Sequence, residues 1–260
     1  MLGLKRKKDA PPDAEHVLGR ARILSMRVVH SMTWPPPDML PELMAPWSEA
    51  DRASFADKYA EACRDIRSSL EANDLWVQTS PAEREFFSVP LVERTMRQLI
   101  DSSWAVESIA CCLWALSMLP AIAPYDQEHE PQATVKQVPK SADGLSLRSS
   151  EELEVARSLA ELWHWRARTR QLLEAGHPLP LPDGLTIDEV VRMTAELAAE
   201  GREGGKPTNG DFPAFGKPYR ELTPEEYQHV TSIAMERHKA LNWICGLAPK
   251  NQWELTPTDT

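Results

Sequence analysis

The sequence predicts an all-α protein, an irregular, orthogonal bundle of about six to eight helices joined by long loops rich in proline and glycine. Two observations favour this class. Apolar residues recur at helical spacing in several long segments, most of which follow a helix-start signal, and no segment alternates apolar and polar residues as a half-buried strand does. The loops between these segments are too long and too uneven for an up-and-down bundle.

The N-terminal part is expected to hold two long helices and a short one. The first runs from Asp13 to about Met32, and the second follows the capping residue Ser48. Ser80, followed by a proline at the first helical position, opens the short helix. Five prolines in residues 34–46 predict an extended, polyproline-like connector.

Residues 90–119 are the longest apolar segment of the chain. Charged side chains interrupt it, so it is predicted to be a buried helix and not a membrane span, which needs roughly 20 mostly apolar residues. We expect a bend near Ser102. Glu107 shares a helix face with Trp104 and Trp114, and it needs a partner because an unpaired buried charge is costly.

The C-terminal part is expected to hold three more helices. Their predicted ranges are about 151–175, 186–199 and 224–245, each with a start or stop signal at its ends. Residues 120–147 are predicted to be a long surface connection. The glycine-rich residues 200–219 lack the strand and the spacing of a phosphate-binding loop, so we expect a plain loop there.

Composition argues against several classes of partner. The 260 residues carry a formal net charge of −10, and a nucleic-acid partner is not expected because phosphate binding needs a basic face. The four cysteines contain no C-x-x-C and are expected to be reduced thiols. Residues 1–12 are expected to be a disordered basic leader. Prolines follow it instead of an apolar run, so no signal peptide and no membrane partner are predicted and a cytoplasmic location is expected.

Five ordered motifs resemble those of one bacterial family. The motifs are W-x-x-E at Trp104–Glu107, the segment Leu147–Leu153, H-W-x-x-R at His164–Arg168, the segment Glu236–Gly246 and W-x-x-x-P-T-D-T at Trp253–Thr260. With them, residues 13–260 resemble the family filed as domain of unknown function 4272, most strongly from Asp101 onward. The resemblance implies one helical domain, with an N-terminal part at 13–88 and a motif-bearing core at 89–260. It implies no activity.

Arg237 lies in the middle of the apolar face of the last predicted helix, as Glu107 does in the central segment. We predict that the two side chains meet as a buried ion pair, with His164 or Arg168 and indole N–H groups completing the hydrogen bonds. Removing one member of such a pair typically costs about 3–5 kcal/mol of stability.

The candidate binding or structural cluster consists of the tryptophans, acids and bases of the motifs. These are Trp104, Glu107, Trp114, His164, Trp165, Arg168, Glu236, Arg237, His238, Trp243 and Asp259. Asp259 is expected either to pair with Arg237 or Arg168 or to belong to a frayed tail.

Glu107, His164, Glu236 and His238 could instead serve acid–base catalysis or hold a metal. However, the chain has no H-E-x-x-H, and residues 236 and 238 face different sides of a helix. No catalytic residue, cofactor or metal is therefore assigned.

These observations favour a non-enzymatic binding or interaction module whose partner is a protein or a small ligand. One alternative is a hydrolase-like or metal-dependent enzyme, which requires Glu107, His164 and Arg237 to share a deep, open pocket. The other is an immunity-type inhibitor of a basic toxin, which the acidity of the chain would suit.

Overall fold

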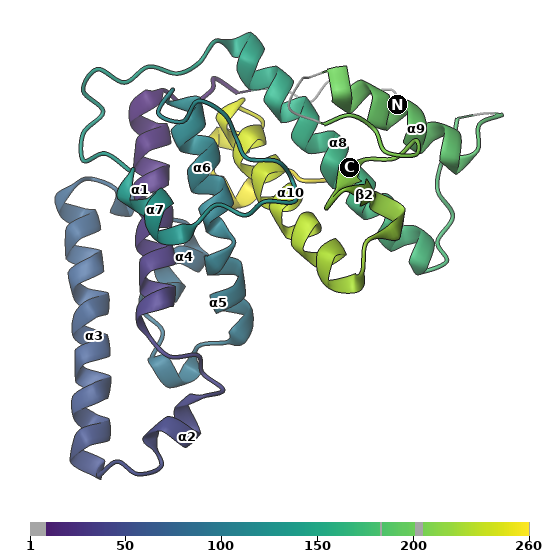
Figure 1. Ribbon diagram of the computed structural model, residues 1–260. Helices are drawn as coiled ribbons and strands as arrows, with labels where there is room; N and C mark the ends of the chain where they lie inside the picture. Colours follow the sequence, from purple (N-terminus) through teal and green to yellow (C-terminus); the bar gives the residue numbers. More distant parts are fainter. Residues whose placement is uncertain (1–8, 183, 201–204, 260) are drawn as a thin grey trace.

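A computed structural model describes residues 9–182, 184–200 and 205–259, and its architecture is all-α, as predicted (Figure 1). Among the described residues, α2, α4 and α7 have 5, 6 and 6 residues, and the other α-helices are longer. The helices are α1 (Ala14–Thr33), α2 (Leu40–Met44), α3 (Glu49–Ala72), α4 (Pro81–Phe86), α5 (Met96–Ser103), α6 (Ala105–Ala115), α7 (Pro131–Lys136), α8 (Ser150–Glu174), α9 (Ile187–Glu200) and α10 (Pro224–Ile244). Strand β1 (Pro213–Ala214) pairs antiparallel with β2 (Lys217–Pro218).

Helix α6 is the centre of the molecule. Figure 1 shows α1, α6, α10 and α8 following one another across the fold, with α3 outside α1 and α9 on the far side of α8. Every residue of α6 is buried, which confirms the predicted central helix. The predicted bend is also present, because α5 ends at Ser103 and α6 starts again at Ala105.

Most of the predicted helix starts are confirmed by capping contacts. Ser48, Ser80, Ser149 and Thr223 each accept a hydrogen bond from the backbone N–H three residues later, and the side chain of that residue bonds back. These reciprocal bonds satisfy backbone donors that the first turn of a helix leaves unpaired.

The prediction for residues 34–46 was wrong, because α2 lies within this segment. Pro41 sits in the first turn of α2, where the missing N–H has no intrahelical partner to lose. Prolines therefore permit this short helix instead of excluding it.

Residues 120–147 are more than a surface connection. They contain α7, and Tyr125 is buried and stacks on Trp163 of α8 with ring centroids 4.6 Å apart. The segment therefore crosses over the core and covers part of it.

The predicted disordered leader is wrong for residues 9–12, whereas residues 1–8 lie outside the described part of the chain. The Asp9 N–H donates to the Gly246 carbonyl oxygen at 2.9 Å, and the Asp9 side chain accepts from the Lys250 N–H at 2.7 Å. Gly246 has a φ of +77°, and an added Cβ would lie 2.6 Å from the Asp9 carbonyl oxygen. Only glycine allows this close approach.

The four cysteines are free thiols, as predicted: Cys63, Cys111 and Cys112 are buried and Cys245 is partly exposed. Within the described ranges, no helix has the length and apolar character needed to cross a bilayer.

Candidate functional site

The predicted ion pair between Glu107 and Arg237 is present at the contact of α6 with α10. Arg237 Nη2 lies 2.7 Å and Nε 2.8 Å from Glu107 Oε2, and both side chains are 0% exposed. The pair thus has no surface in contact with solvent.

The groups that complete this network are not the ones predicted. His129, which precedes α7, donates its backbone N–H to Glu107 Oε1 at 2.7 Å, and its Nδ1 lies 3.0 Å from Oε2. Arg237 donates to the carbonyl oxygens of Ala123 and Gln127 at 2.5 and 3.1 Å. His164, Arg168 and indole N–H groups take no part in this network. The loop that covers the ion pair, residues 123–129, supplies the remaining hydrogen bonds instead.

These contacts determine the charge state of Glu107. Burial by itself raises the pKa of this carboxyl, but the hydrogen bonds from His129 and the charge of Arg237 outweigh burial and bring the pKa below its usual value. Glu107 is therefore an ionised, fully occupied carboxylate, and it presents no free oxygen to a ligand.

A second buried network joins α8 to α10 and to the C-terminal segment. His164 Nδ1 lies 2.9 Å from His238 Nδ1, and Asn242 Nδ2 lies 2.8 Å from His238 Nε2 and 2.7 Å from the Pro257 carbonyl oxygen. The carbonyl oxygen can only accept, so the Asn242 amide donates both to it and to His238 Nε2. His238 then carries its proton on Nδ1 and donates it to His164 Nδ1.

This order of donors requires His164 to be neutral. Burial, with a smaller contribution from the nearby charge of Arg168, lowers the pKa of His164 to about 4. The accepting Nδ1 of His164 leaves its proton on Nε2, so this ring has an N–H donor outside the pair.

His164 also lines an open cleft of about 630 Å³ between α5, α8 and α10. Candidate residues Trp104, His164 and Arg168 meet here, and the Trp104 and His229 rings are 5.5 Å apart. Six of the nine remaining lining residues are polar: the nine are Ile100, Ala167, Gln171, Glu225, Tyr227, Gln228, Thr231, Ser232 and Met235. The cleft is within the size range of small-ligand sites. Sequence reasoning missed His229 as a cleft residue, because it lies off the apolar stripe of α10.

The structure separates the other candidate residues from this cleft. Trp114 and Trp243 are buried core residues, and Trp243 Nε1 donates to the Asn251 carbonyl oxygen at 2.9 Å. Glu236 accepts from the Ser108 hydroxyl at 2.8 Å. Asp259 is exposed, and the tail before it is docked through Pro257.

Trp165 lies in a different place, a groove of about 650 Å³ between α8 and α9. The groove has a mostly apolar floor and acidic residues at its edge: Glu154, Val155, Ser158, Leu159, Glu161, Leu162, Trp165, Leu197, Ala198 and Glu200. Val155 and Leu197 are 48% and 55% exposed, so their side chains are open to a partner.

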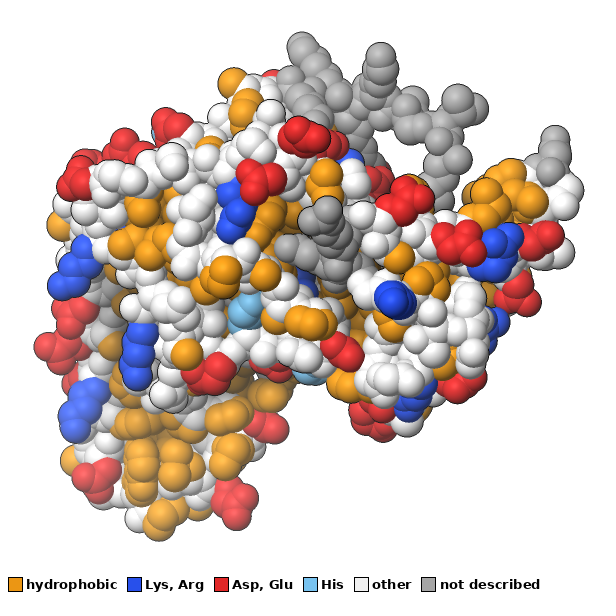
Figure 2. Space-filling view, turned by 45° about the horizontal axis from the view of Figure 1, so that its top comes forward, with side chains coloured by type: hydrophobic (Ala, Val, Ile, Leu, Met, Phe, Trp, Pro, Cys, Tyr) orange, Lys and Arg blue, Asp and Glu red, His pale blue; other side chains and the backbone are white. Residues whose placement is uncertain are grey.

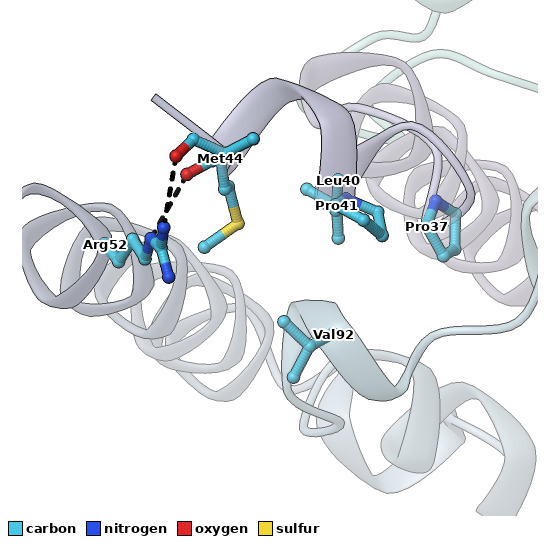
Figure 3. Close-up of a pocket in the computed structure, with 7 residues that line it drawn as sticks. Pro37, Leu40, Pro41, Met44, Arg52 and Val92 are labelled. Atoms are coloured by element: carbon cyan, nitrogen blue, oxygen red, sulfur yellow. Dashed lines mark hydrogen bonds between the residues drawn. The ribbon is translucent and has the colours of Figure 1, made fainter. Parts of the chain in front are cut away.

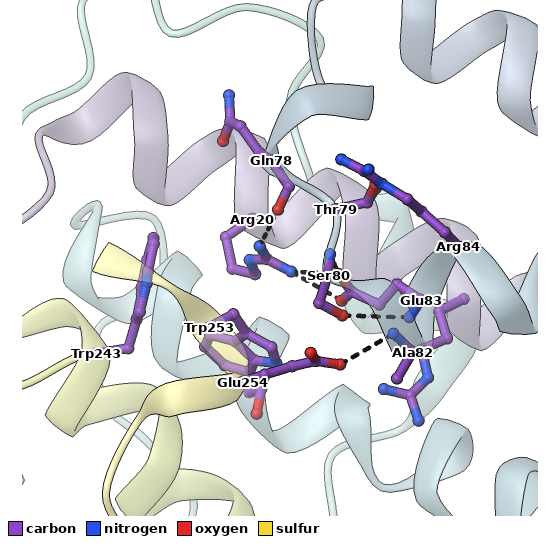
Figure 4. A network of polar contacts seen from close by, with 12 residues as sticks. Arg20, Gln78, Thr79, Ser80, Ala82, Glu83, Arg84, Trp243, Trp253 and Glu254 are labelled. Carbon is purple, nitrogen blue, oxygen red and sulfur yellow. Dashed lines mark hydrogen bonds and ion pairs between the residues drawn. The ribbon is translucent and has the colours of Figure 1, made fainter. Parts of the chain in front are cut away.

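Two further buried ion pairs were not predicted. Arg20 binds both carboxylate oxygens of Glu83 at 2.8 and 2.9 Å (Figure 4), and Arg166 binds both oxygens of Asp211 at 2.8 Å. Glu83 is also the capping-box partner of Ser80, a local role that gives no sign of a distant arginine. Asp211 lies in the glycine-rich segment, where no periodicity marks a buried position.

The four residues proposed for catalysis or metal binding do not form one site. Glu107 is sealed with Arg237, Glu236 is held by Ser108, and His164 and His238 contact each other. In the described part of the chain, no three His, Cys, Asp or Glu side chains are grouped so that they could hold a metal ion.

Comparison with curated proteins and with solved structures gave no match. A family model, described as domain of unknown function (DUF4272), matches residues 11–192, which is more than half of the chain. The matched range contains the first three motifs noted in the sequence and stops before the last two. The chain therefore belongs to the family of domains of unknown function DUF4272.

Proposed function

We propose that the protein is a non-enzymatic binding module whose cleft at Trp104, His164 and Arg168 takes a small ligand. The observation that carries this proposal is that the ion pair is sealed in the core while the cleft is open to solvent. Glu107 and Arg237 are 0% exposed and saturated with internal partners, whereas His164 lines the cleft. An enzyme using these three residues would need all of them in contact with its substrate.

The lining of the cleft favours a ligand that combines an acidic group with an apolar part. Arg168 is exposed at the cleft, where it donates to the Gln171 side chain and lies among amides and hydroxyls of α8 and α10. Glu225 is the one carboxylate among these lining residues. Trp104 and Met235 supply apolar surface on which a ring or aliphatic chain packs.

A matched pair of probes tests this chemistry. Phenylacetate and its neutral amide, phenylacetamide, differ only in the acidic group. Titration of the ¹⁵N-labelled protein, followed by NMR, should show phenylacetate shifting signals of the cleft residues and binding more tightly than the amide. Arg168→Met should weaken phenylacetate binding about 10-fold, which corresponds to loss of one charge-assisted contact of about 1.4 kcal/mol.

Arg97→Met is the control, because Arg97 is an exposed arginine on α5 whose guanidinium pairs with Asp101 outside the cleft. It should leave the affinity unchanged. Equal binding of the two probes, or equal binding by wild type and Arg168→Met, would overturn the assignment of the cleft.

The groove at Trp165 supports a second binding function, the capture of a basic amphipathic helix of a partner protein. Its apolar floor suits the apolar face of such a helix. Glu154 and Glu161 at its edge both pair with Arg157. Glu200 and the net charge of −10 therefore supply the attraction for lysines and arginines on the flanks of the helix. An inhibitor of a basic toxin would use a surface of this kind, in a cytoplasmic location that the free thiols suit.

A synthetic helical peptide with leucines on one face and lysines on the other tests this surface. Leu197→Lys should weaken its binding at least 10-fold, because it places a positive charge on the apolar floor. Met193→Lys makes the same change at a residue of α9 that is also about half exposed but does not line the groove, and it should bind like wild type. Equal effects of the two substitutions would exclude the groove as the binding surface.

A further inference from the structure

Four arginines in the described part of the chain are buried, and one of them has no acidic partner there. Arg20, Arg94, Arg166 and Arg237 are 3%, 3%, 5% and 0% exposed. Arg20, Arg166 and Arg237 each bind a buried carboxylate, on Glu83, Asp211 and Glu107. Within the described residues, neither Nε, Nη1 nor Nη2 of Arg94 makes a hydrogen bond of ordinary geometry, and the neutral Tyr59 hydroxyl is the polar side chain that interacts with the guanidinium.

The surroundings of Arg94 are aromatic and uncharged. Its guanidinium lies over the rings of Phe86 and Tyr59, at 4.3 and 5.1 Å from their centroids. The titratable groups that influence it are Tyr59, Cys63 and His30. Burial raises the pKa of Tyr59 and of Cys63, and burial together with the charge of Arg94 lowers the pKa of His30 to about 3. At neutral pH all three groups are uncharged, so none of them balances the guanidinium.

A second buried donor lies against the same tyrosine. The Trp34 ring packs edge-on to Tyr59 with centroids 5.1 Å apart, and Trp34 Nε1 also has no hydrogen-bond partner in the described chain. The region therefore contains four buried N–H-bearing nitrogens without a hydrogen bond of ordinary geometry, three on Arg94 and one on Trp34. Buried donors are almost always satisfied in folded proteins, and a buried unpaired charge is among the least favourable arrangements.

Open space borders this region. A pocket of about 260 Å³ is lined by Pro37, Leu40, Pro41, Met44, Ala45, Arg52 and Val92 (Figure 3). Leu40 and Met44 also pack in one apolar cluster with Tyr59 and Leu91, so the pocket lies beside the Arg94 region. Among these lining residues the one charged side chain is Arg52, which donates to the carbonyl oxygens of Met44 and Ala45 (Figure 3).

The surface around α2 and the start of α3 is rich in apolar side chains, which gather at the lower left of Figure 2. Met39, Leu43 and Val92 are 58%, 41% and 68% exposed. An anion entering here would leave water for a region of apolar surface and unpaired donors, where attraction to a guanidinium is stronger than in bulk water.

We propose that Arg94 is the anchor of a second, internal binding site, which takes a small oxyanion such as a carboxylate or a phosphate group. The guanidinium presents a planar pair of N–H donors that matches two oxygens of such a group. The bound anion would balance the charge of Arg94, as the carboxylates of Glu83, Asp211 and Glu107 balance the charges of the other three buried arginines.

Thermal unfolding in different salts tests this site. At pH 7 and constant ionic strength, sodium acetate or sodium phosphate should raise the melting temperature of the wild-type protein in a saturable way, by ~5 °C at a hundred times the dissociation constant. Sodium chloride should raise it less. A larger shift with phosphate identifies a phosphoryl ligand, and a larger shift with acetate identifies a carboxylate.

Two variants of Arg94 make the test specific. Arg94→Met should abolish the shift, and Arg94→Lys, which retains the charge but not the paired donors, should reduce it and serves if the methionine variant does not fold. Arg97→Met and the cleft variant Arg168→Met should retain the full shift, which separates this site from the proposed cleft. An equal response to all three salts, or an unchanged acetate and phosphate response in either Arg94 variant, would overturn the proposal.

Discussion

Glu107 and Arg237 are 130 residues apart in the chain, and their contact at 2.7 Å joins two helices of the core without exposing either side chain. The carboxylate also accepts from His129, and the guanidinium also donates to backbone carbonyls of the same crossing segment. One ion pair thus fixes α6, α10 and the loop that covers them. Such a network fixes the way segments pack, even where its net contribution to stability is small.

The first prediction concerns the carboxylate of this pair. Glu107→Gln should lower the free energy of unfolding by about 3–5 kcal/mol, because it leaves the buried charge of Arg237 unbalanced. Urea denaturation monitored by circular dichroism measures the change. Glu61→Gln, an exposed position on α3, is the control and should change stability by less than about 0.5 kcal/mol. If Glu107→Gln were as stable as wild type, Arg237 would not depend on this carboxylate.

The second prediction distinguishes the contribution of the loop that contains His129 from that of helices α6 and α10. His129→Leu removes the ring contact to Glu107 Oε2 but keeps the backbone N–H bond to Oε1. We expect a loss of about 1–3 kcal/mol, smaller than that for Glu107→Gln. Hydrogen exchange should accelerate in residues 121–130 more than in α6. Equal acceleration in both regions would mean that the loop and the helix open as one unit.

The helix starts and the ion pair could both be predicted from the sequence, but for different physical reasons. The helix starts at Ser48, Ser80, Ser149 and Thr223 were predictable because capping is a local interaction whose signal lies within four residues. The pairing of two charges on apolar helix faces was predictable because an unpaired buried charge is so unfavourable.

The role of His129 and the partner of Arg166 were not predictable in this way. His129 and Asp211 lie in segments without periodic apolar positions, so nothing local indicates that they are buried. The same limit applied to α2, where prolines in a first turn look like those of an extended connector. The cleft depends on how α5, α8 and α10 meet, which is a property of tertiary packing and not of any one helix.

A third prediction concerns the glycine-rich segment. Asp211 accepts from Arg166 and from the backbone N–H groups of Phe212 and Arg220, so one side chain holds the segment against α8. Asp211→Asn should cost about 3–5 kcal/mol and release this segment. Limited proteolysis should then cleave within residues 205–220 faster than in wild type. Asp57→Asn, at an exposed position on α3, should leave the cleavage rate unchanged.

A fourth prediction concerns pH. The pKa of His30 is lowered to about 3 and that of His164 to about 4, from an ordinary value of 6.5. Below pH 6.5 the unfolded chain binds protons at these positions that the folded protein does not bind. Stability should therefore be complete above pH 6.5 and fall as the pH falls toward 4, by about 1.4 kcal/mol per pH unit for each histidine once the unfolded form is protonated.

Urea denaturation between pH 7 and pH 5 isolates this effect, because ordinary carboxyl groups stay ionised over most of that range. His30→Phe should reduce the slope of stability against pH, since it removes one of the two groups. His177→Phe, at an exposed position, should not change the slope. A wild-type slope in His30→Phe would show that His30 titrates normally in the folded protein.

The last prediction concerns the C-terminal segment, which the buried histidine network holds in place. The Pro257 carbonyl oxygen accepts from Asn242, and the Glu254 carboxylate accepts from the Ala82 N–H at 3.1 Å (Figure 4). Deleting residues 254–260 removes both contacts and leaves a buried amide donor of Asn242 without its acceptor. Loss of the acceptor alone costs about 1–3 kcal/mol, so the melting temperature should fall by roughly 2–12 °C. The substitution Glu254→Gln, which leaves Pro257 in place, should have a much smaller effect. A truncated protein that melts like wild type would mean that the tail contributes nothing to the fold and that Asn242 finds another acceptor.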